Sequence, residues 1–196
     1  MKSPATLYRS PSTVSFDRSK LALSYDVDCL QKEVLQVIAQ YPPYIYYSAI
    51  PLTMPGERNA NITDFSDPDW TTWIKTKVLN ECPYIQSVLS SLDCRTTNVR
   101  ILRLESGGEI KAHTDPQLNV QFRNQVRLHI PIFTTEQVEF LLNGVPVPLR
   151  PGELWYMRLS DPHSVINNGP TERIHLSIDV VVNDWIETMI AQGYIA

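Results

Sequence analysis

The sequence predicts a mainly β fold, a double-stranded β-helix barrel of the jelly-roll, cupin-like type, with helices in the N-terminal half. After Cys94, short segments rich in β-branched and aromatic residues follow one another, with turn signals roughly every 8–12 residues. Helical spacing of apolar residues is confined to the region before Cys94 and to the last residues of the chain. Such a succession of short strands is typical of a sandwich or a barrel.

The bulk composition is that of an ordinary globular domain. The chain has 196 residues, of which 43% are hydrophobic and 19% are charged, and its net charge is −4. No basic patch stands out, so we expect no nucleic-acid partner. No apolar run reaches the length of a membrane span, so we expect no membrane association. The composition leaves the oligomeric state undetermined.

The cysteines and the N-terminal segment point to the cytoplasm. Cys29, Cys82 and Cys94 are an odd number of thiols without the short spacing of a metal site, which fits a reducing compartment better than a disulfide framework. Residues 1–15 are polar and lack the apolar stretch of a signal peptide. We therefore expect a soluble cytoplasmic protein.

We expect one domain after a short N-terminal extension. Residues 1–22, rich in Ser, Thr and Pro, are predicted to be extended or partly disordered. Residues 23–196 form the predicted domain. Within it, 23–95 make a helical layer with at least one strand, 96–182 make the barrel core, and 183–196 make a C-terminal helix.

The helical layer begins where apolar residues recur at helical spacing, from Asp26 until Pro42-Pro43 stops the helix. A strand over Tyr44–Leu52 and a long polar loop over Thr53–Pro68 follow, and this loop is a candidate lid. Two short helices are predicted next. Their buried residues are Trp70, Trp73, Ile74 and Val78 in the first, and Ile85, Val88, Leu89 and Leu92 in the second, which Pro83 opens.

The strands of the barrel are separated by turns. Asn143-Gly144 between two apolar runs is the strongest short hairpin signal, and Pro151-Gly152 marks another turn. A last helix over Trp185–Gln192 is predicted to end at Gly193. The predicted strands are 98–105, 109–114, 125–133, 138–142, 145–149, 153–157 and 173–182.

His113 and Asp115 are the first candidate metal ligands. Residues two apart in a strand point to the same face, so this pair could hold one ion. His163, at a predicted turn after Asp161-Pro162, is the candidate for the third ligand. Two imidazoles and one carboxylate, with open positions, form the set that binds non-haem Fe(II) in oxygenases. The alternatives are a solvated hairpin end for His113 and Asp115, and a turn-stabilising role for His163.

Polar residues alternate with apolar ones in two predicted barrel strands. One face of a closed barrel is the interior, where a charged side chain is costly unless a ligand, a metal or another charge pairs with it. Arginine suits a buried carboxylate because its planar fork donates two parallel hydrogen bonds. The alternatives are histidines satisfied in the core and exposed arginines in cross-strand ion pairs. The residues concerned are Arg127 and His129 in one strand, and Arg173, His175, Ser177 and Asp179 in the other.

Taken together, these motifs resemble the aspartyl/asparaginyl β-hydroxylase family of Fe(II)- and 2-oxoglutarate-dependent dioxygenases, and they are similar to those of bacterial proline hydroxylase-like relatives. The resemblance covers about residues 98–182. It depends on His113-Thr114-Asp115, Arg127-Leu128-His129, Gly152-Glu153-Leu154-Trp155, Pro162-His163-Ser164 and Arg173-Ile174-His175.

The resemblance implies a double-stranded β-helix enzyme that hydroxylates an unactivated C–H bond with Fe(II), 2-oxoglutarate as co-substrate and O2. The implied substrate is an amino acid, either an Asp/Asn-type residue in a peptide or a free amino acid. No catalytic residue beyond the metal ligands is implied. The implied ligands are His113, Asp115 and His163 for iron, and the implied contacts of 2-oxoglutarate are Arg173, Arg127 and His129.

Departures from the family pattern concern the metal set and the substrate. Some family members have glycine at the position of Asp115, so this chain is similar to the branch with a complete triad. Relatives often have an acidic residue at the position of Arg158, and a cation there would change which substrate group is tolerated. Arg123, Arg158 and Trp155 are the candidate substrate contacts, although Trp155 also fits a core role.

Two other functions fit the same residues. A different metal in a cupin-like barrel could perform a non-oxidative reaction such as isomerisation or epimerisation. A non-catalytic barrel could bind a small acid or a protein partner. A purely structural role for all four histidines is disfavoured, because core packing alone has little use for two arginines on the same strands.

Overall fold

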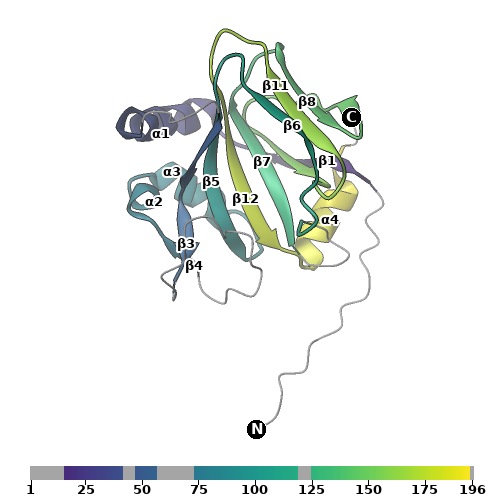
Figure 1. Cartoon of the computed structure of the whole chain (residues 1–196). Coiled ribbons are helices and arrows are strands. Elements are labelled where there is room, and N and C mark those ends of the chain that lie inside the picture. Colours follow the sequence, from purple (N-terminus) through teal and green to yellow (C-terminus); the bar gives the residue numbers. More distant parts are fainter. Residues whose placement is uncertain (1–15, 42–46, 57–72, 119–124, 195–196) are drawn as a thin grey trace.

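The computed structural model describes residues 16–41, 47–56, 73–118 and 125–194. Figure 1 shows two β-sheets that face each other, with helices gathered against one of them. This arrangement of strands is the predicted double-stranded β-helix, so the fold class is confirmed. The barrel occupies the C-terminal part of the chain, and a helical layer precedes it.

The larger sheet contains the central strand of the fold. Its strands are β1 (Arg18–Ser24), β2 (Tyr47–Pro51), β5 (Thr96–Leu104), β7 (Gln125–Phe133), β10 (Glu153–Met157) and β12 (Arg173–Val181). They are antiparallel, in the order β1–β10–β7–β12–β5–β2. β12 therefore has a neighbour on each side, and the residues from Arg173 to Val181 are buried except at the last position.

The smaller sheet brings two histidines together. Its strands are β6 (Glu109–His113), β8 (Val138–Leu142), β9 (Val145–Pro146) and β11 (His163–Asn167), in the order β6–β11–β8–β9. In this register His163 lies opposite His113 of β6 and opposite Leu142 of β8. β8 and β9 form the predicted hairpin, in which Asn143 and Gly144 have φ of 54° and 75°, as a two-residue type I′ turn requires.

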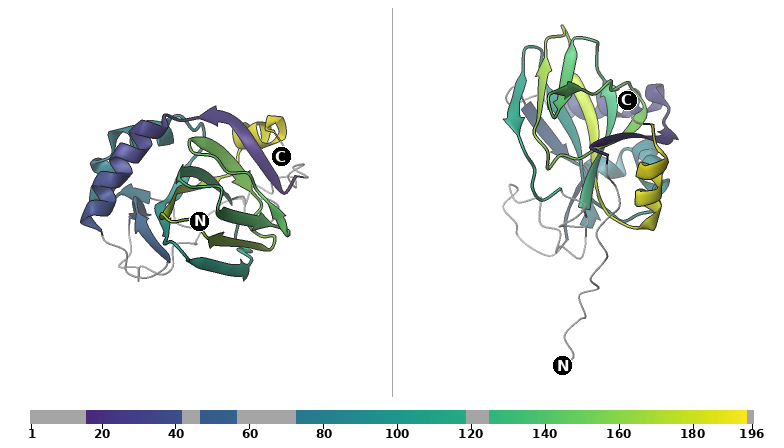
Figure 2. Two further views of the ribbon diagram at one scale, coloured as in Figure 1. Left: turned by 90° about the horizontal axis from the view of Figure 1, so that it is seen from above. Right: turned by 90° about the vertical axis from the view of Figure 1, so that its right-hand side faces the viewer.

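The helices cover the outer face of the larger sheet (Figure 2). They are α1 (Val27–Gln40), α2 (Lys77–Asn80), α3 (Pro83–Ser90) and α4 (Asp184–Gln192). α1 begins as predicted after Asp26, whose carboxylate accepts a hydrogen bond from the Cys29 N–H at 2.9 Å. Among the described residues, no helix combines the length and the apolar character that a membrane crossing needs.

The two faces of the larger sheet have different chemistry. Its outer face packs apolar side chains against the helices, including Ile101, Leu128 and Leu176, which are fully buried. Its inner face points toward the smaller sheet and bears the alternating polar residues of β7 and β12. His129 and Arg173, with 4% and 2% exposure, are buried there. Both faces are therefore inside the protein, as the barrel interpretation of the alternating pattern required.

Several short elements differ from the sequence prediction. Trp73 and Ile74, expected in a helix, lie in β4 (Trp73–Lys75), which pairs with β3 (Thr53–Pro55) where a loop was expected. A three-residue run is too short for its period to distinguish a strand from a helix, and the pairing joins segments distant in sequence. Residues 57–68 of the predicted loop and Trp70 lie outside the described residues. Residues 18–22, expected in an N-terminal extension, belong to β1, which pairs with β10.

We expect Gly152→Ala to destabilise the fold more than Gly144→Ala. Both glycines have positive φ, 80° and 75°, which costs an L-residue about 1–2 kcal/mol. A Cβ at Gly152 would also lie 2.6 Å from the Tyr25 carbonyl oxygen and 2.8 Å from Val27 Cγ2, whereas one at Gly144 meets nothing within 4 Å. We therefore expect unfolding free energies lower by about 1 kcal/mol for Gly144→Ala and about 2–4 kcal/mol for Gly152→Ala, measured by urea denaturation. Equal losses would contradict the close approach at Gly152.

Candidate metal centre

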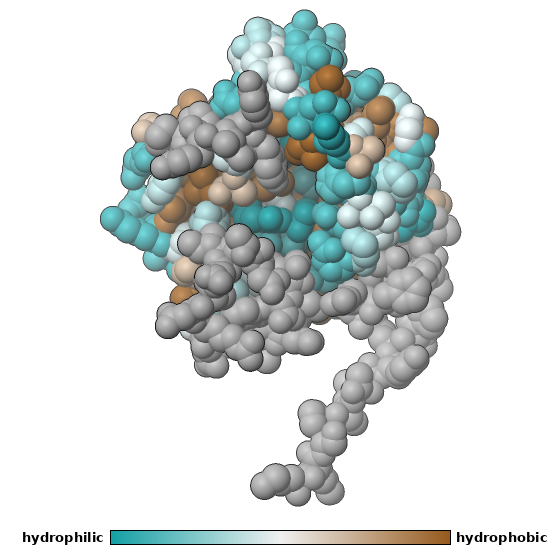
Figure 3. Space-filling view, in the orientation of Figure 1, coloured by the Kyte–Doolittle hydropathy of each residue, from teal (hydrophilic) through white to brown (hydrophobic). Residues whose placement is uncertain are grey.

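A cavity of about 350 Å³ lies between the two sheets. In Figure 3 the face of the molecule seen in Figure 1 is hollowed near its middle, and hydrophilic residues lie in this hollow. The larger sheet contributes Asn98, Arg100, Leu102, Arg127, His129 and Arg173 to the cavity lining, and the smaller sheet with its loops contributes Ile110, His113, Asp115, Gln117, Phe140, Leu159, His163 and Val165. Both groups of sequence-predicted site residues therefore meet at one cavity.

His113 and His163 form a cross-strand pair at the edge of this cavity. Their ring centroids are 4.2 Å apart. The Nδ1 atom of His113 lies 2.8 Å from the Lys111 carbonyl oxygen, and that of His163 lies 3.0 Å from the Asp161 carbonyl oxygen. Because a carbonyl oxygen only accepts, each Nδ1 donates, and the Nε2 lone pair of each neutral ring is left for a ligand.

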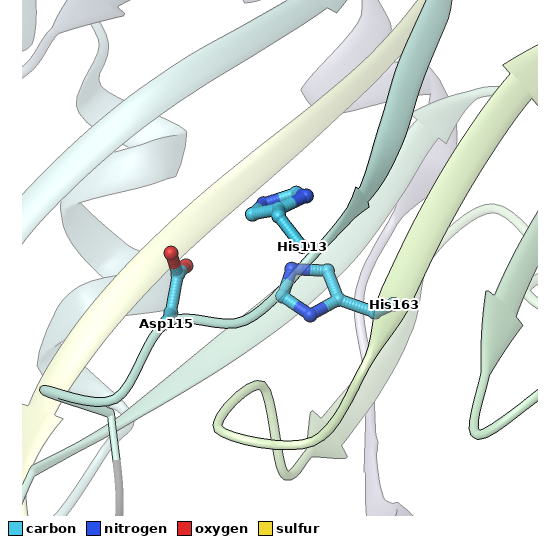
Figure 4. A group of neighbouring side chains, drawn as sticks. All are labelled: His113, Asp115 and His163. Atoms are coloured by element: carbon cyan, nitrogen blue, oxygen red, sulfur yellow. The ribbon is translucent and has the colours of Figure 1, made fainter.

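Asp115 completes a set of three candidate ligands. Its ligand oxygen and one nitrogen of each histidine all lie within 4.8 Å of one another, and Figure 4 shows the three side chains converging. The sequence pattern placed His113 and Asp115 in the same strand. The strand β6 ends at His113, and Asp115 lies in the loop that follows it. Its backbone N–H donates to the Leu159 carbonyl oxygen at 2.8 Å, which ties Asp115 to the segment between β10 and β11.

The electrostatics of His163 suit metal ligation. Its side chain is buried, and this burial lowers its pKa, an effect that the hydrogen bond to the Asp161 carbonyl opposes and the nearby His113 reinforces. The neutral imidazole is the form that binds a metal. The donor set of two neutral imidazoles and one carboxylate fits a divalent transition metal, and iron in particular when positions stay open.

The turn before His163 is braced by an ion pair. The guanidinium of Arg158 donates to the Asp161 carboxylate at 2.8–3.0 Å, and Asn143 Nδ2 donates to the same carboxylate at 2.7 Å. The Asp161 carbonyl oxygen, in turn, accepts from His163. Arg158 was predicted to contact substrate, but it does not line the cavity. Its side chain supports the backbone that positions His163.

Arg173 and His129 of the larger sheet line the cavity, and further buried polar residues of β12 lie beside them. Arg173 Nη2 donates to His175 Nδ1 at 2.8 Å, and both residues are buried. Ser177 of β12 lies opposite His129 of β7. Within the described residues, neither ring nitrogen of His129 nor the Ser177 hydroxyl has a hydrogen-bond partner. Buried polar atoms without a hydrogen-bond partner are rare in proteins, and a polar ligand in the cavity would satisfy those of His129, which lines it.

Burial also keeps the two inner histidines uncharged. The pKa values of His129 and His175 are lowered well below the usual value, first by burial and then by the positive charge of Arg173. The positive charge in this part of the cavity therefore comes from arginine. An anionic ligand would meet a fixed guanidinium flanked by neutral donors and acceptors.

Arg127 lines the cavity, and its guanidinium contacts two carboxylates of the protein. Its Nε and Nη2 atoms donate to the two oxygens of Asp179 at 2.6 and 3.0 Å, and its Nη1 donates to Asp115 Oδ2 at 3.0 Å. The guanidinium thus joins a candidate metal ligand to a buried carboxylate of β12. A contact with a co-substrate would compete with these ion pairs.

Of the two remaining predicted substrate residues, Trp155 is described and does not line the cavity. Trp155 of β10 is 1% exposed, lies opposite His129 in the sheet, and donates its indole N–H to Glu153 at 2.9 Å. It packs in the barrel interior, which is the core role considered for it. Arg123 lies outside the described residues.

The sequence interpretation missed Asn98 and Arg100 of β5, although polar residues at alternate positions of a predicted strand are the same signal that identified His129 and Arg173.

The comparisons with known proteins agree with this geometry. The family described as aspartyl/asparaginyl β-hydroxylase matches residues 59–182, which are 124 of the 196 residues. The match begins earlier than the resemblance found over residues 98–182. Comparison with curated proteins finds no match.

Three solved structures share the fold, each with a TM-score of 0.51. A prolyl-4-hydroxylase from Pseudomonas putida is 14% identical, and the alignment covers 86% of this chain and 94% of that one. A viral collagen prolyl hydroxylase from Paramecium bursaria Chlorella virus-1, solved as a 2-oxoglutarate complex, is 11% identical, with 86% and 98% covered. An oxidoreductase of the 2OG-Fe(II) oxygenase family from Burkholderia pseudomallei is 15% identical, with 79% of each chain covered.

We expect Asp115→Ala and His163→Ala to weaken Mn(II) binding by at least about 100-fold. Removing a residue that only hydrogen-bonds to a metal ligand typically lowers metal affinity 10–100-fold, and removing the ligand itself should lower it more. Free Mn(II) can be counted by electron paramagnetic resonance in titrations of the purified protein. Glu136→Ala, which removes an exposed carboxylate away from the cavity lining, is the control and should bind as the unaltered protein does. Unchanged affinity in Asp115→Ala would exclude this metal centre.

Proposed function

Because the chain belongs to the aspartyl/asparaginyl β-hydroxylase family, we propose that it is an Fe(II)- and 2-oxoglutarate-dependent dioxygenase that hydroxylates an amino acid. The family is one of hydroxylases, and this protein is an enzyme of that class. The metal, the co-substrate and the substrate are the proposed parts. They are supported by the residues around the cavity.

One observation supports the proposal most strongly. His113, Asp115 and His163 converge at the edge of a cavity to which the facing sheet contributes the buried Arg173. This donor set is the one that holds non-haem Fe(II) with open positions. Bound iron, with 2-oxoglutarate and O2, would supply the oxidation of an unactivated C–H bond, while 2-oxoglutarate is converted to succinate and CO2.

The residues of the larger sheet are suited to hold 2-oxoglutarate. Arg173 can donate to a carboxylate of the co-substrate, and the acceptor at His175 Nδ1 limits how its guanidinium can rotate. His129, which lines the cavity, offers ring nitrogens that have no hydrogen-bond partner among the described residues. The interior excludes bulk water, which strengthens each of these contacts relative to the same contact at the surface.

The proposed substrate is an amino acid, either free or as an Asp/Asn-type residue in a peptide. The cavity of about 350 Å³ is at the small end of ligand sites, so a co-substrate leaves room for one side chain or one small amino acid. Asn98, Arg100 and Gln117 line it and can recognise a carboxylate or an amide by hydrogen bonds. No general base is required of the chain, because the metal site supplies the oxidation.

We also propose a cytoplasmic location. Cys29, Cys82 and Cys94 are free thiols, and free thiols persist in a reducing compartment. Burial raises the pKa of Cys82 to about 11 and that of Cys94 to about 12, so these two thiols stay protonated and unreactive. A reducing environment also keeps iron in the ferrous state.

We expect substrate-dependent release of succinate when the protein is supplied with Fe(II), ascorbate, 2-oxoglutarate and O2. Free amino acids and Asp- or Asn-containing peptides form the panel, and Asp115→Ala is the inactive control. Thermal stabilisation by 2-oxoglutarate without turnover across the panel would instead indicate a binding protein. An altered substrate isomer formed without O2 consumption would indicate a non-oxidative metal enzyme. Either result overturns the proposal.

We expect Arg173→Lys to raise the KM for 2-oxoglutarate more than it lowers kcat. Lysine keeps the charge but lacks the planar fork, so it loses a charge-assisted hydrogen bond worth about 1.5–3 kcal/mol, which corresponds to roughly 10–150-fold in KM. Arg95→Lys, at an exposed position, is the matched control. Steady-state kinetics with varied 2-oxoglutarate test the prediction. An unchanged KM would remove Arg173 from the co-substrate site.

A further inference from the structure

Asp179 is a deeply buried carboxylate beside the candidate metal centre, and among the described residues its side-chain hydrogen bonds are with Arg127. The two residues lie opposite each other in the register of β12 and β7. Both Asp179 oxygens accept from the Arg127 fork, at 2.6 and 3.0 Å. The Asp179 side chain is 2% exposed, so an ionised carboxylate there depends on this partner.

The same guanidinium reaches the candidate metal ligand. With Nε and Nη2 directed to Asp179, Nη1 donates to Asp115 Oδ2 at 3.0 Å. The exposed fraction of the side chains rises along this chain of contacts, from 2% at Asp179 through 12% at Arg127 to 20% at Asp115. The contacts therefore lead from the sheet interior to the cavity.

We propose that Asp179 is a positioning residue for the metal ligand Asp115 and acts on it through Arg127. The bidentate contact fixes the plane of the guanidinium, and Nη1 then holds Oδ2 of Asp115 so that Oδ1 is left for the ion. This inference rests on the metal centre of the proposed function. It gives Arg127 a role in metal binding instead of the co-substrate contact that the family resemblance implies.

The charges support this role. An arginine paired with Asp115 alone would neutralise the ligand and compete with a divalent cation for its carboxylate. Asp179 offsets the guanidinium charge, so that Asp115 keeps its negative charge for the metal while it is oriented by a hydrogen bond. Outer partners that orient ligating carboxylates in this way typically change metal affinity by 10–100-fold when removed.

We expect Asp179→Asn to weaken Mn(II) binding by about 10-fold or more. The metal alone is the probe, and binding is followed by electron paramagnetic resonance. The Co(II) absorption spectrum of the loaded protein gives a second readout, which should change if the carboxylate ligand is reoriented. Once metal is saturating, the KM for 2-oxoglutarate should change less than metal affinity does. A larger effect on 2-oxoglutarate than on Mn(II) would return Arg127 to the co-substrate site and overturn the inference.

A matched control separates this role from stability. Arg103 and Glu172 form another bidentate ion pair on β5 and just before β12, with 5% and 18% exposure, and neither residue lines the cavity. Glu172→Gln should lower the unfolding free energy but leave Mn(II) affinity unchanged. Equal losses of affinity in Asp179→Asn and Glu172→Gln would assign both to general destabilisation and overturn the inference.

A double-mutant cycle tests that Asp179 acts through Arg127. In an Arg127→Gln background, Asp179→Asn should have little further effect on Mn(II) affinity, whereas additive effects would show that the two residues act independently. If the Asp179→Asn variant does not fold, the Arg127→Lys variant is tested in its place. Lysine keeps the positive charge but cannot hydrogen-bond to the carboxylates of Asp179 and Asp115 at the same time, as the arginine fork does. Wild-type affinity in Arg127→Lys would overturn the inference. Failure of the unaltered protein to bind Mn(II) would instead refute the metal centre itself.

Discussion

The burial of β12 on both faces is the constraint on which the rest of the structure depends. Its apolar side chains pack against the helical layer, and its polar side chains lie between the sheets. Water cannot solvate that polar face, so each charge on it needs a partner inside the protein. Arg173 has His175, and Asp179 has Arg127. The interior polar groups that can bind a ligand are a consequence of this central strand.

The smaller sheet supplies the other half of the centre by backbone pairing. Antiparallel register places His163 directly across from His113, and the loop after β6 returns Asp115 to the same place. Hydrogen bonds then select the tautomer of His113 and of His163. In each ring Nδ1 faces a carbonyl oxygen and therefore carries the proton. Backbone geometry and local hydrogen bonds thus prepare the same two Nε2 atoms for one ion.

Two arginines beside the centre, Arg158 and Arg127, form ion pairs with carboxylates of the protein. Arg158 braces the turn before His163, and Arg127 joins Asp179 to Asp115. From the sequence, Arg127 was assigned to the co-substrate because of its place on an inner barrel face and the family resemblance, and Arg158 was named a candidate substrate contact because it departs from the family pattern. In the folded chain each one is engaged by a carboxylate of the protein. Both contacts hold residues next to, or within, the candidate metal-ligand set, which is the basis of the positioning role proposed for Asp179 and Arg127.

The sequence by itself determined the fold class, most barrel strands, the Asn143-Gly144 hairpin and the three candidate ligands, because alternation, turn chemistry and His-x-Asp spacing are local properties. It did not determine the pairing of β3 with β4, the strand that begins at His163, or the partner of Arg127. Those features depend on contacts between segments far apart in the chain. Only the tertiary structure decided which charges face one another, because register between distant strands selects each pair.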